Sequence, residues 1–140
     1  MKILVVDDEP AILSAIARAL KKTSSSLQIE TAKDGFEAGQ KAAEFRPDLV
    51  ILDLLLPGVD GFKVCENLKG SRPDIKILAI TGQASSEVRA RIKACGADGF
   101  LAKPFEMEDL VGEVGRLISI EPLTLPSPSR GEGKKEKASK

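Results

Sequence analysis

Five polar residues stand where short apolar runs of the sequence end, and their types could do chemistry together. They lie at or next to the ends of runs that suit buried strands: Asp7, Asp8, Asp53, Thr81 and Lys103. In a parallel sheet the carboxyl ends of the strands lie at one edge, where open α/β folds bind their ligands. We therefore expect three carboxylates, a hydroxyl and an ammonium group to converge in one crevice.

Such a group of side chains suits a hard cation and phosphoryl transfer. Clustered carboxylates repel one another, and an oxygen-only ligand set with room for water favours Mg²⁺, with Mn²⁺ as the other candidate. Asp53 ends the most apolar strand, so it is the natural nucleophile for an attack on phosphorus. The metal ion and Lys103 would neutralise the phosphoryl oxygens, and the Thr81 hydroxyl would donate a further hydrogen bond.

Each of these residues also has an ordinary structural explanation when it is taken alone. Asp8, which lies shortly before Pro10, and Asp53 both suit turns or helix caps. Thr81 suits a strand end or a cap, and Lys103 suits a solvated surface position. The convergence of all of them on one edge is what favours a site.

The apolar runs predict the strands that position these residues. Residues 3–6, 49–52 and 77–80 are continuously apolar, as strands buried on both faces of a parallel sheet are. Residues 27–31 alternate between apolar and polar, which predicts an edge strand, and residues 99–102 are a weaker candidate. Five strands that alternate with five helices predict an α/β fold with a parallel sheet covered on both faces.

Apolar residues at helical spacing fill the intervals between the strands. Pro10 suits the first turn of the first helix, and Asp34 with Glu37 resembles a capping box that opens the second. Gly96 marks the end of the fourth helix. The apolar faces of the five helices are expected to contain Ile12, Leu13, Ile16, Ala17, Leu20; Phe36, Ala38, Ala42, Ala43, Phe45; Phe62, Val64, Cys65, Leu68; Val88, Ile92, Cys95; and Met107, Leu110, Val111, Val114, Leu117, Ile118.

Composition excludes several classes of protein. The 140 residues include no histidine and two cysteines, which excludes histidine-dependent catalysis, histidine-ligated zinc and a disulfide framework. The formal net charge is zero, and the sequence has neither a phosphate-binding glycine loop nor a long apolar segment. We therefore expect a cytoplasmic protein with reduced thiols, no membrane insertion and no direct nucleic acid binding.

The end of the sequence differs in composition from the rest. Residues 121–140 include three prolines, five basic and three acidic side chains, whereas residues 1–120 carry a net charge of −2. A segment with so few apolar residues does not offset its ordering entropy. We expect one domain over residues 1–120 and a disordered tail over residues 121–140, with a linker of a longer protein as the alternative.

Four stretches of the sequence form a specific combination of motifs. They are Val-Val-Asp-Asp-Glu-Pro at 5–10, Leu-Asp-Leu-Leu-Leu-Pro-Gly-Val-Asp-Gly at 52–61, Ile-Thr-Gly at 80–82 and Gly-Ala-Asp-Gly-Phe-Leu-Ala-Lys-Pro-Phe at 96–105. None is sufficient alone, but in this order they resemble the receiver domain of bacterial response regulators, over about residues 1–120. The resemblance implies a flavodoxin-like doubly wound sheet of five parallel strands in the order 2-1-3-4-5, with five helices.

The resemblance also implies an activity and a set of metal ligands. Asp53 resembles the phosphoacceptor, which takes a phosphoryl group from a sensor histidine kinase, a histidine phosphotransfer protein or a small donor such as acetyl phosphate. Asp8 resembles the direct Mg²⁺ ligand, and Asp7 resembles the residue that holds the ion through water. The backbone carbonyl of Leu55 would be a further ligand.

The same resemblance implies a switch. Thr81 and Lys103 resemble the pair that contacts the acyl phosphate, and the peptide bond between Lys103 and Pro104 is expected to be cis. Phe100 stands at the switch-aromatic position and is expected to turn inward as Thr81 moves toward the phosphate. The alternative for Phe100 is a permanently buried strand residue.

Two positions near the site differ from the family's pattern in a way that predicts slow loss of phosphate. The positions two residues after Asp53 and Thr81 tune self-dephosphorylation in this family, and here they are Leu55 and Gln83. Leu55 does not orient a water molecule by hydrogen bonding, so we expect a fairly long-lived phosphoform.

A second departure concerns dimers. Arg89 and Asp109 suit one cross-interface pair of the winged-helix transcriptional members, but Asp98 would face Glu113, where those members have opposite charges. We therefore expect a monomer or a weak phosphorylation-dependent dimer.

The resemblance implies that the output is partner binding. The family's partner surface, made by the fourth helix, the fifth strand and the fifth helix, includes Arg89, Lys93, Phe100 and Glu108. The surface that meets a phosphotransfer helix includes Ala11, Ser14, Ala15, Pro104 and Phe105. We expect a stand-alone receiver that catalyses only its own phosphorylation and dephosphorylation. The alternatives are a fragment of a longer regulator, an aspartate-nucleophile phosphatase, which would need a second Asp at position 55, and a phosphate-independent scaffold.

Overall fold

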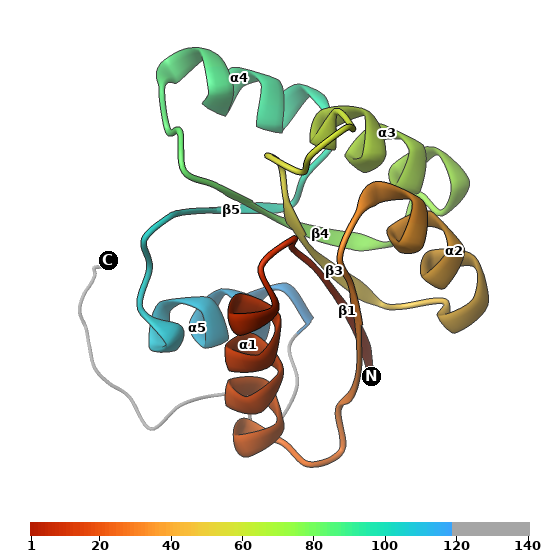
Figure 1. Ribbon diagram of the computed structural model, residues 1–140, viewed down its shortest axis with the longest axis vertical. Helices are drawn as coiled ribbons and strands as arrows, with labels where there is room; N and C mark the ends of the chain where they lie inside the picture. Colours follow the sequence, from red (N-terminus) through yellow and green to blue (C-terminus); the bar gives the residue numbers. More distant parts are fainter. Residues whose placement is uncertain (119–140) are drawn as a thin grey trace.

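The structure is a computed structural model that describes residues 1–118, where five strands alternate with five helices (Figure 1). The predicted α/β class is therefore confirmed. The predictions made for residues 121–140, and for the end of the domain near residue 120, lie outside the described residues.

A single parallel sheet forms the centre of the fold, in the order β2-β1-β3-β4-β5 that the family resemblance implies. The three inner strands are β1 (Lys2–Val6), β3 (Leu49–Asp53) and β4 (Lys76–Thr81), and the edge strands are β2 (Gln28–Ala32) and β5 (Gly99–Ala102). The three continuous apolar runs lie in the inner strands, as predicted.

The two faces of the sheet carry separate apolar layers, which explains why the inner strands are apolar throughout. Helices α1 (Pro10–Thr23) and α5 (Met107–Ile118) cover one face, and α2 (Gly35–Phe45), α3 (Gly61–Ser71) and α4 (Ser86–Ala94) cover the other (Figure 1). Alternate residues of each inner strand pack against opposite layers. None of these helices, which are all that the described residues contain, is long and apolar enough to cross a membrane.

The edge strand β2 begins one residue later than predicted. Leu27 precedes the strand and is buried, and pairing with β1 starts at Gln28. The predicted alternation is present, because Ile29 is half-buried between the exposed Gln28 and Glu30.

The starts of α1 and α2 follow the sequence signals, with one difference in the cap. Pro10 occupies the first turn of α1, and the Asp34 side chain accepts a hydrogen bond of 2.7 Å from the backbone N–H of Glu37. The Glu37 carboxylate accepts from the N–H of Lys33, one residue before the cap, rather than from Asp34 itself.

The prediction that Phe36 lies on the buried face of α2 is wrong, because its side chain is 80% exposed. Ala38 is the fully buried residue of this helix. Residues two positions apart in an α-helix lie about 200° apart around its axis. A helix that buries Ala38 therefore turns Phe36 toward solvent.

Candidate functional site

The strand ends bring the predicted site residues to one edge of the sheet. Asp53 and Thr81 are the last residues of β3 and β4, and Asp7 and Lys103 come directly after β1 and β5. Backbone hydrogen bonds continue past the strand ends, from Asp7 N to Ala32 O at 3.1 Å and from Lys103 N to Thr81 O at 2.8 Å. These bonds fix the backbone from which the side chains project.

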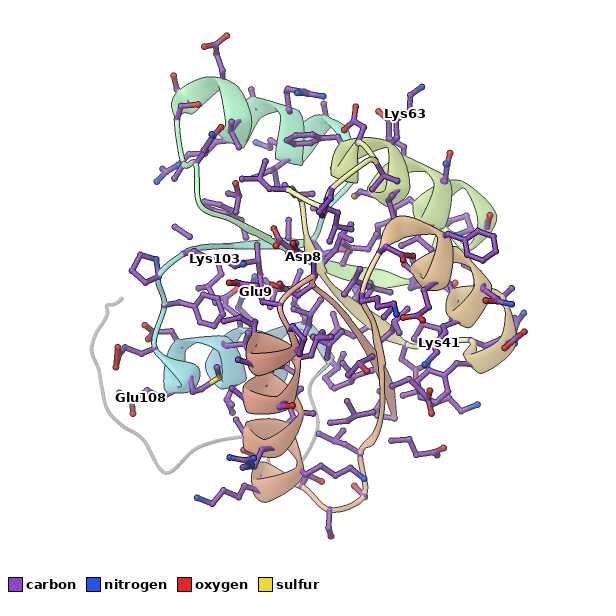
Figure 2. The ribbon with its side chains drawn as sticks, viewed as in Figure 1. Asp8, Glu9, Lys41, Lys63, Lys103 and Glu108 are labelled. Carbon is purple, nitrogen blue, oxygen red and sulfur yellow. The ribbon has the colours of Figure 1, made fainter. Side chains whose placement is uncertain are left out.

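Lys103 is at the centre of the site. Its Nζ lies 3.0 Å from Oδ2 of Asp7, 3.1 Å from Oδ2 of Asp53 and 3.8 Å from Oε1 of Glu9. Figure 2 shows Lys103, Asp8 and Glu9 together at this edge of the sheet. The two aspartates are 1% and 4% exposed, so the ammonium group neutralises carboxylates that water barely reaches.

Backbone N–H groups orient both buried carboxylates. Oδ1 of Asp53 accepts a hydrogen bond of 3.0 Å from the N–H of Leu55, and Oδ1 of Asp7 accepts one of 2.9 Å from the N–H of Glu9. In each residue Oδ1 is held by the backbone while Oδ2 faces Lys103.

The pKa values of two site residues are displaced. Burial raises the pKa of Asp53 above its usual range, although the Leu55 N–H and Lys103 oppose the change, and the Asp7 charge adds to it. Burial lowers the pKa of Lys103, but its hydrogen bonds to Asp7 and Asp53, together with the charges of those two carboxylates, outweigh burial and raise the pKa overall. Lys103 is therefore a permanent cation at neutral pH.

Three carboxylates at this edge fit a divalent metal ion. Oxygen atoms of Asp7, Asp8 and Asp53 all lie within 4.8 Å of one another, and Asp8 is exposed, so one side of the group is open to water. Lys103 contacts three carboxylates, those of Asp7, Glu9 and Asp53, and Asp8 adds a fourth negative charge to the cluster. An oxygen-only set with excess negative charge and access to water matches the requirements of Mg²⁺ or Mn²⁺.

The two predicted switch residues, Thr81 and Phe100, make their contacts outside this cluster. The Thr81 hydroxyl accepts from the Gln83 N–H at 3.0 Å and donates to the Gln83 carbonyl at 3.2 Å. Phe100 is half-buried, with the Arg89 guanidinium 5.5 Å from its ring centroid. The Lys103–Pro104 peptide bond is cis.

Sequence reasoning missed two contacts of the site. Glu9 was not predicted as a partner of Lys103, although it follows Asp7 and Asp8 directly. The backbone of Gln83 was not predicted to hold Thr81, although a threonine hydroxyl commonly bonds the backbone two residues on. Glu9 is next to two predicted site residues and Gln83 is two residues from Thr81, but the sequence does not show which of the neighbouring oxygen atoms each side chain contacts.

Comparison with known proteins shows which family this chain resembles. The family model described as the response regulator receiver domain matches residues 3–115. A curated relative, response regulator MprA of Mycobacterium leprae, is 37% identical over 118 residues, which are 84% of this chain and 51% of that protein. The chain therefore spans about half the length of the curated relatives that it matches.

Solved structures agree with this match over the whole described fold. The signal receiver domain of a DNA binding response regulator protein from Colwellia psychrerythraea is 28% identical, with a TM-score of 0.80 and coverage of 86% of this chain and 99% of that chain. Chemotaxis protein CheY4 of Vibrio cholerae is 34% identical, with a TM-score of 0.77 and coverage of 84% and 98%.

Proposed function

We propose, since this chain belongs to the response regulator receiver domain family, that Asp53 is its phosphoacceptor and that phosphorylation changes the surface presented to a partner. The observation that carries the proposal is the ion-paired cluster in which Lys103 joins the buried Asp53 to Asp7. Proteins of this family act in signalling. In this proposal the domain catalyses only its own phosphorylation and dephosphorylation.

The surroundings of Asp53 suit a nucleophile. The Leu55 N–H holds one carboxylate oxygen, which fixes the plane of the group, and the other oxygen faces Lys103 at 3.1 Å. Because burial raises the pKa of Asp53, its carboxylate is more basic than an exposed one. This favours attack on the phosphorus of the donor, while the bond from phosphorus to the leaving group, acetate or the donor histidine, breaks. Lys103 would then neutralise an oxygen of the transferred group.

The carboxylates of Asp7, Asp8 and Asp53 would hold Mg²⁺ or Mn²⁺, with the Leu55 carbonyl as a further ligand. Asp8 is the exposed member, so it suits direct contact with an ion arriving from solvent, whereas Asp7 would hold the ion through water. When bound, the ion supplies positive charge that neutralises the phosphoryl oxygens and the crowded carboxylates.

Thr81 and Phe100 would carry the change to the surface. Within residues 1–118, the Thr81 hydroxyl bonds only the backbone of Gln83, two residues on. Exchange of these local bonds for one to a phosphoryl oxygen would require little rearrangement. Movement of Thr81 would leave space that the half-buried Phe100 ring enters. The Arg89 contact with that ring would then be lost, which alters the surface of α4 and β5.

The proposed partners are of two kinds. A sensor histidine kinase or histidine phosphotransfer protein would dock beside the site, over Ala11, Ser14, Ala15, Pro104 and Phe105. The output would pass through the α4–β5–α5 surface. The alternative output is an effector domain of a longer protein, since the matched relatives are about twice as long as the aligned region.

A monomer or a weak phosphorylation-dependent dimer is the proposed assembly. Asp98 is held within the domain by Lys69 at 2.8 Å, and Glu113 by Arg116 at 2.8 Å. Both carboxylates therefore have internal partners, and a dimer that brings them together gains no new ion pair from them.

The test is the amide spectrum of the labelled protein with beryllofluoride and Mg²⁺, which together imitate the phosphoryl group. We expect shifts at Asp53, Thr81 and Phe100 and along α4, and none in Asp53→Asn. Shifts confined to Asp7 and Asp8 would mean metal binding without a switch, and the phosphate-independent scaffold would then replace this proposal.

A further inference from the structure

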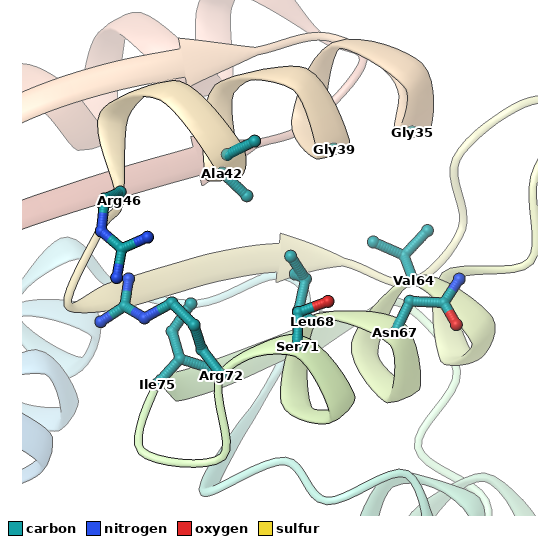
Figure 3. Close-up of a pocket in the computed structure, with 11 residues that line it drawn as sticks. Gly35, Gly39, Ala42, Arg46, Val64, Asn67, Leu68, Ser71, Arg72 and Ile75 are labelled. Carbon is teal, nitrogen blue, oxygen red and sulfur yellow. The ribbon is translucent and has the colours of Figure 1, made fainter.

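A groove lies between helices α2 and α3, which cover the same face of the sheet. Its volume is about 400 Å³, within the range of small-molecule sites. Its lining contains none of the phosphoacceptor cluster, so it is separate from the site described above. Figure 3 shows the groove running between the two helices.

The groove exists because α2 presents no large side chain on this side. Gly35, Gly39 and Ala42 form its α2 wall, opposite Val64 and Leu68 of α3. A Cβ atom added at Gly39 would meet no atom within 4 Å, so the space beside it is open. The walls are therefore mainly apolar, and they are flat on the α2 side.

Two arginines close one end of the groove. Figure 3 shows the guanidinium groups of Arg46 and Arg72 pointing toward one another. Arg72 donates from Nη1 to the Pro47 carbonyl at 2.6 Å, and its Nε lies 3.9 Å from the exposed carboxylate of Asp74. Within residues 1–118, the Arg46 guanidinium group has no hydrogen-bonded or ion-paired partner, although the Arg46 backbone N–H donates to the Ala42 carbonyl at 3.2 Å. No acidic residue lines the groove.

Arg46 also has an unusual backbone. It caps α2 with a φ of 53°, in the left-handed region where glycine is preferred. An arginine therefore occupies a position whose backbone conformation glycine adopts with less strain. As a result, a second cation lies beside Arg72. Two guanidinium groups that face each other form a ready site for a doubly charged anion.

We infer that this groove binds a compact aromatic phosphate monoester. The phosphate would lie between Arg46 and Arg72, and the ring would lie against the flat α2 wall and Leu68. Asn67 and Ser71 of α3 also line the groove and would hydrogen-bond polar atoms on the ring's edge. The binding is non-covalent and does not require Asp53, so it is independent of the proposed phosphorylation.

The test is a titration of the labelled full chain with phenyl phosphate, without divalent cations, followed by amide shifts. Phenol and inorganic phosphate, which correspond to the ring and the anion of this ligand, are titrated separately as controls. We expect shifts at Gly35, Gly39 and Ser71, with phenyl phosphate binding at least tenfold more tightly than either half. Equal affinity for inorganic phosphate, or shifts only around Asp8 and Leu55, would overturn the inference.

Two variants change separate parts of the groove and are expected to keep the fold. Arg46→Gly removes one cation and suits the left-handed backbone, and Gly39→Leu fills the open space beside α2. Each is expected to weaken phenyl phosphate binding at least fivefold, whereas Arg18→Ala, at an exposed position of α1, leaves it unchanged. Unchanged affinity in both groove variants would show that the ligand binds elsewhere and would contradict the inference.

Discussion

Nζ of Lys103 lies 3.1 Å from Oδ2 of Asp53, although 50 residues separate the two in the sequence. The pair forms because β3 and β5 end at the same edge of the sheet, on either side of β4. Asp7 shares the same ammonium group from the other side, at 3.0 Å. One cation therefore serves two carboxylates that are almost completely buried.

Removal of this cation is expected to destabilise the domain. In Lys103→Met, Asp7 and Asp53 keep their burial and lose their charged partner, so the free energy of unfolding should fall by about 1–3 kcal/mol. The measurement is urea unfolding in the presence of a chelator. Lys63→Met, at an exposed position of α3, is the control and should have the same midpoint as the parent protein. An unchanged midpoint in Lys103→Met would mean that the ion pairs contribute nothing.

Divalent metal ions are expected to stabilise the folded domain through the three carboxylates. At a Mg²⁺ concentration of one hundred times Kd, binding to the native state alone adds about 2.7 kcal/mol. Asp8→Asn should lose most of this increment, because Asp8 is the proposed direct ligand and the exposed carboxylate of the three. Thermal unfolding with and without Mg²⁺ measures this gain in stability. Asp74→Asn, which changes an exposed carboxylate outside the cluster, is the matched control. Equal increments in both variants would place the ion elsewhere.

The lifetime of the phosphoform is expected to depend on Leu55. Its side chain is 51% exposed, next to the proposed phosphoacceptor, and it offers a water molecule no hydrogen bond. Leu55→Asn should shorten the lifetime several-fold, because an amide can orient the attacking water. Decay of the phosphoform, followed by mass after removal of the donor, gives the two rates. A parent protein that loses its phosphate as fast as this variant would refute the expectation.

The neighbouring free thiols of Cys65 and Cys95 are expected not to react with thiol reagents in the native state. Their sulfur atoms lie 2.9 Å apart inside the α3–α4 layer, and burial raises the pKa of Cys65 well above its ordinary value of 9.0. At pH 8 a disulfide reagent should therefore label neither thiol until urea unfolds the chain. Rapid labelling of the native protein would contradict this.

The same pKa shift makes stability depend on alkaline pH. Above pH 9 the Cys65 thiol ionises in the unfolded chain and stays protonated in the native one. The unfolded state then binds fewer protons, so stability falls with rising pH, by up to about 1.4 kcal/mol per pH unit. Urea unfolding at pH 8 and pH 10 should show a shallower fall in Cys65→Ala. Parallel profiles would exclude a contribution from this thiol.

Most of the fold was predictable because its signals are local and periodic. Strands buried on both faces must be apolar throughout, and β1, β3 and β4 meet that requirement. The cluster at the sheet edge was predictable for a topological reason, since the ends of parallel strands meet wherever they lie in the sequence. The outward position of Phe36 was open to calculation from helical geometry, once Ala38 was known to face the sheet.

The features that sequence reasoning missed depend on the distance between two helices and on side-chain geometry in the loops. The spacing of α2 and α3 sets the groove between them, and no periodicity within either helix reports that spacing. The partners chosen by Thr81 and Lys103 depend on side-chain geometry at the loop ends, where several oxygen atoms compete. Such choices follow from the assembled structure.

The mass of the intact protein, after incubation with acetyl phosphate and Mg²⁺, tests the central claim most directly. The account predicts one added phosphoryl group that hydroxylamine removes, and no addition in Asp53→Ala or with a chelator present. An adduct of the same mass in Asp53→Ala would place the phosphoryl group on another residue and contradict the assignment of Asp53.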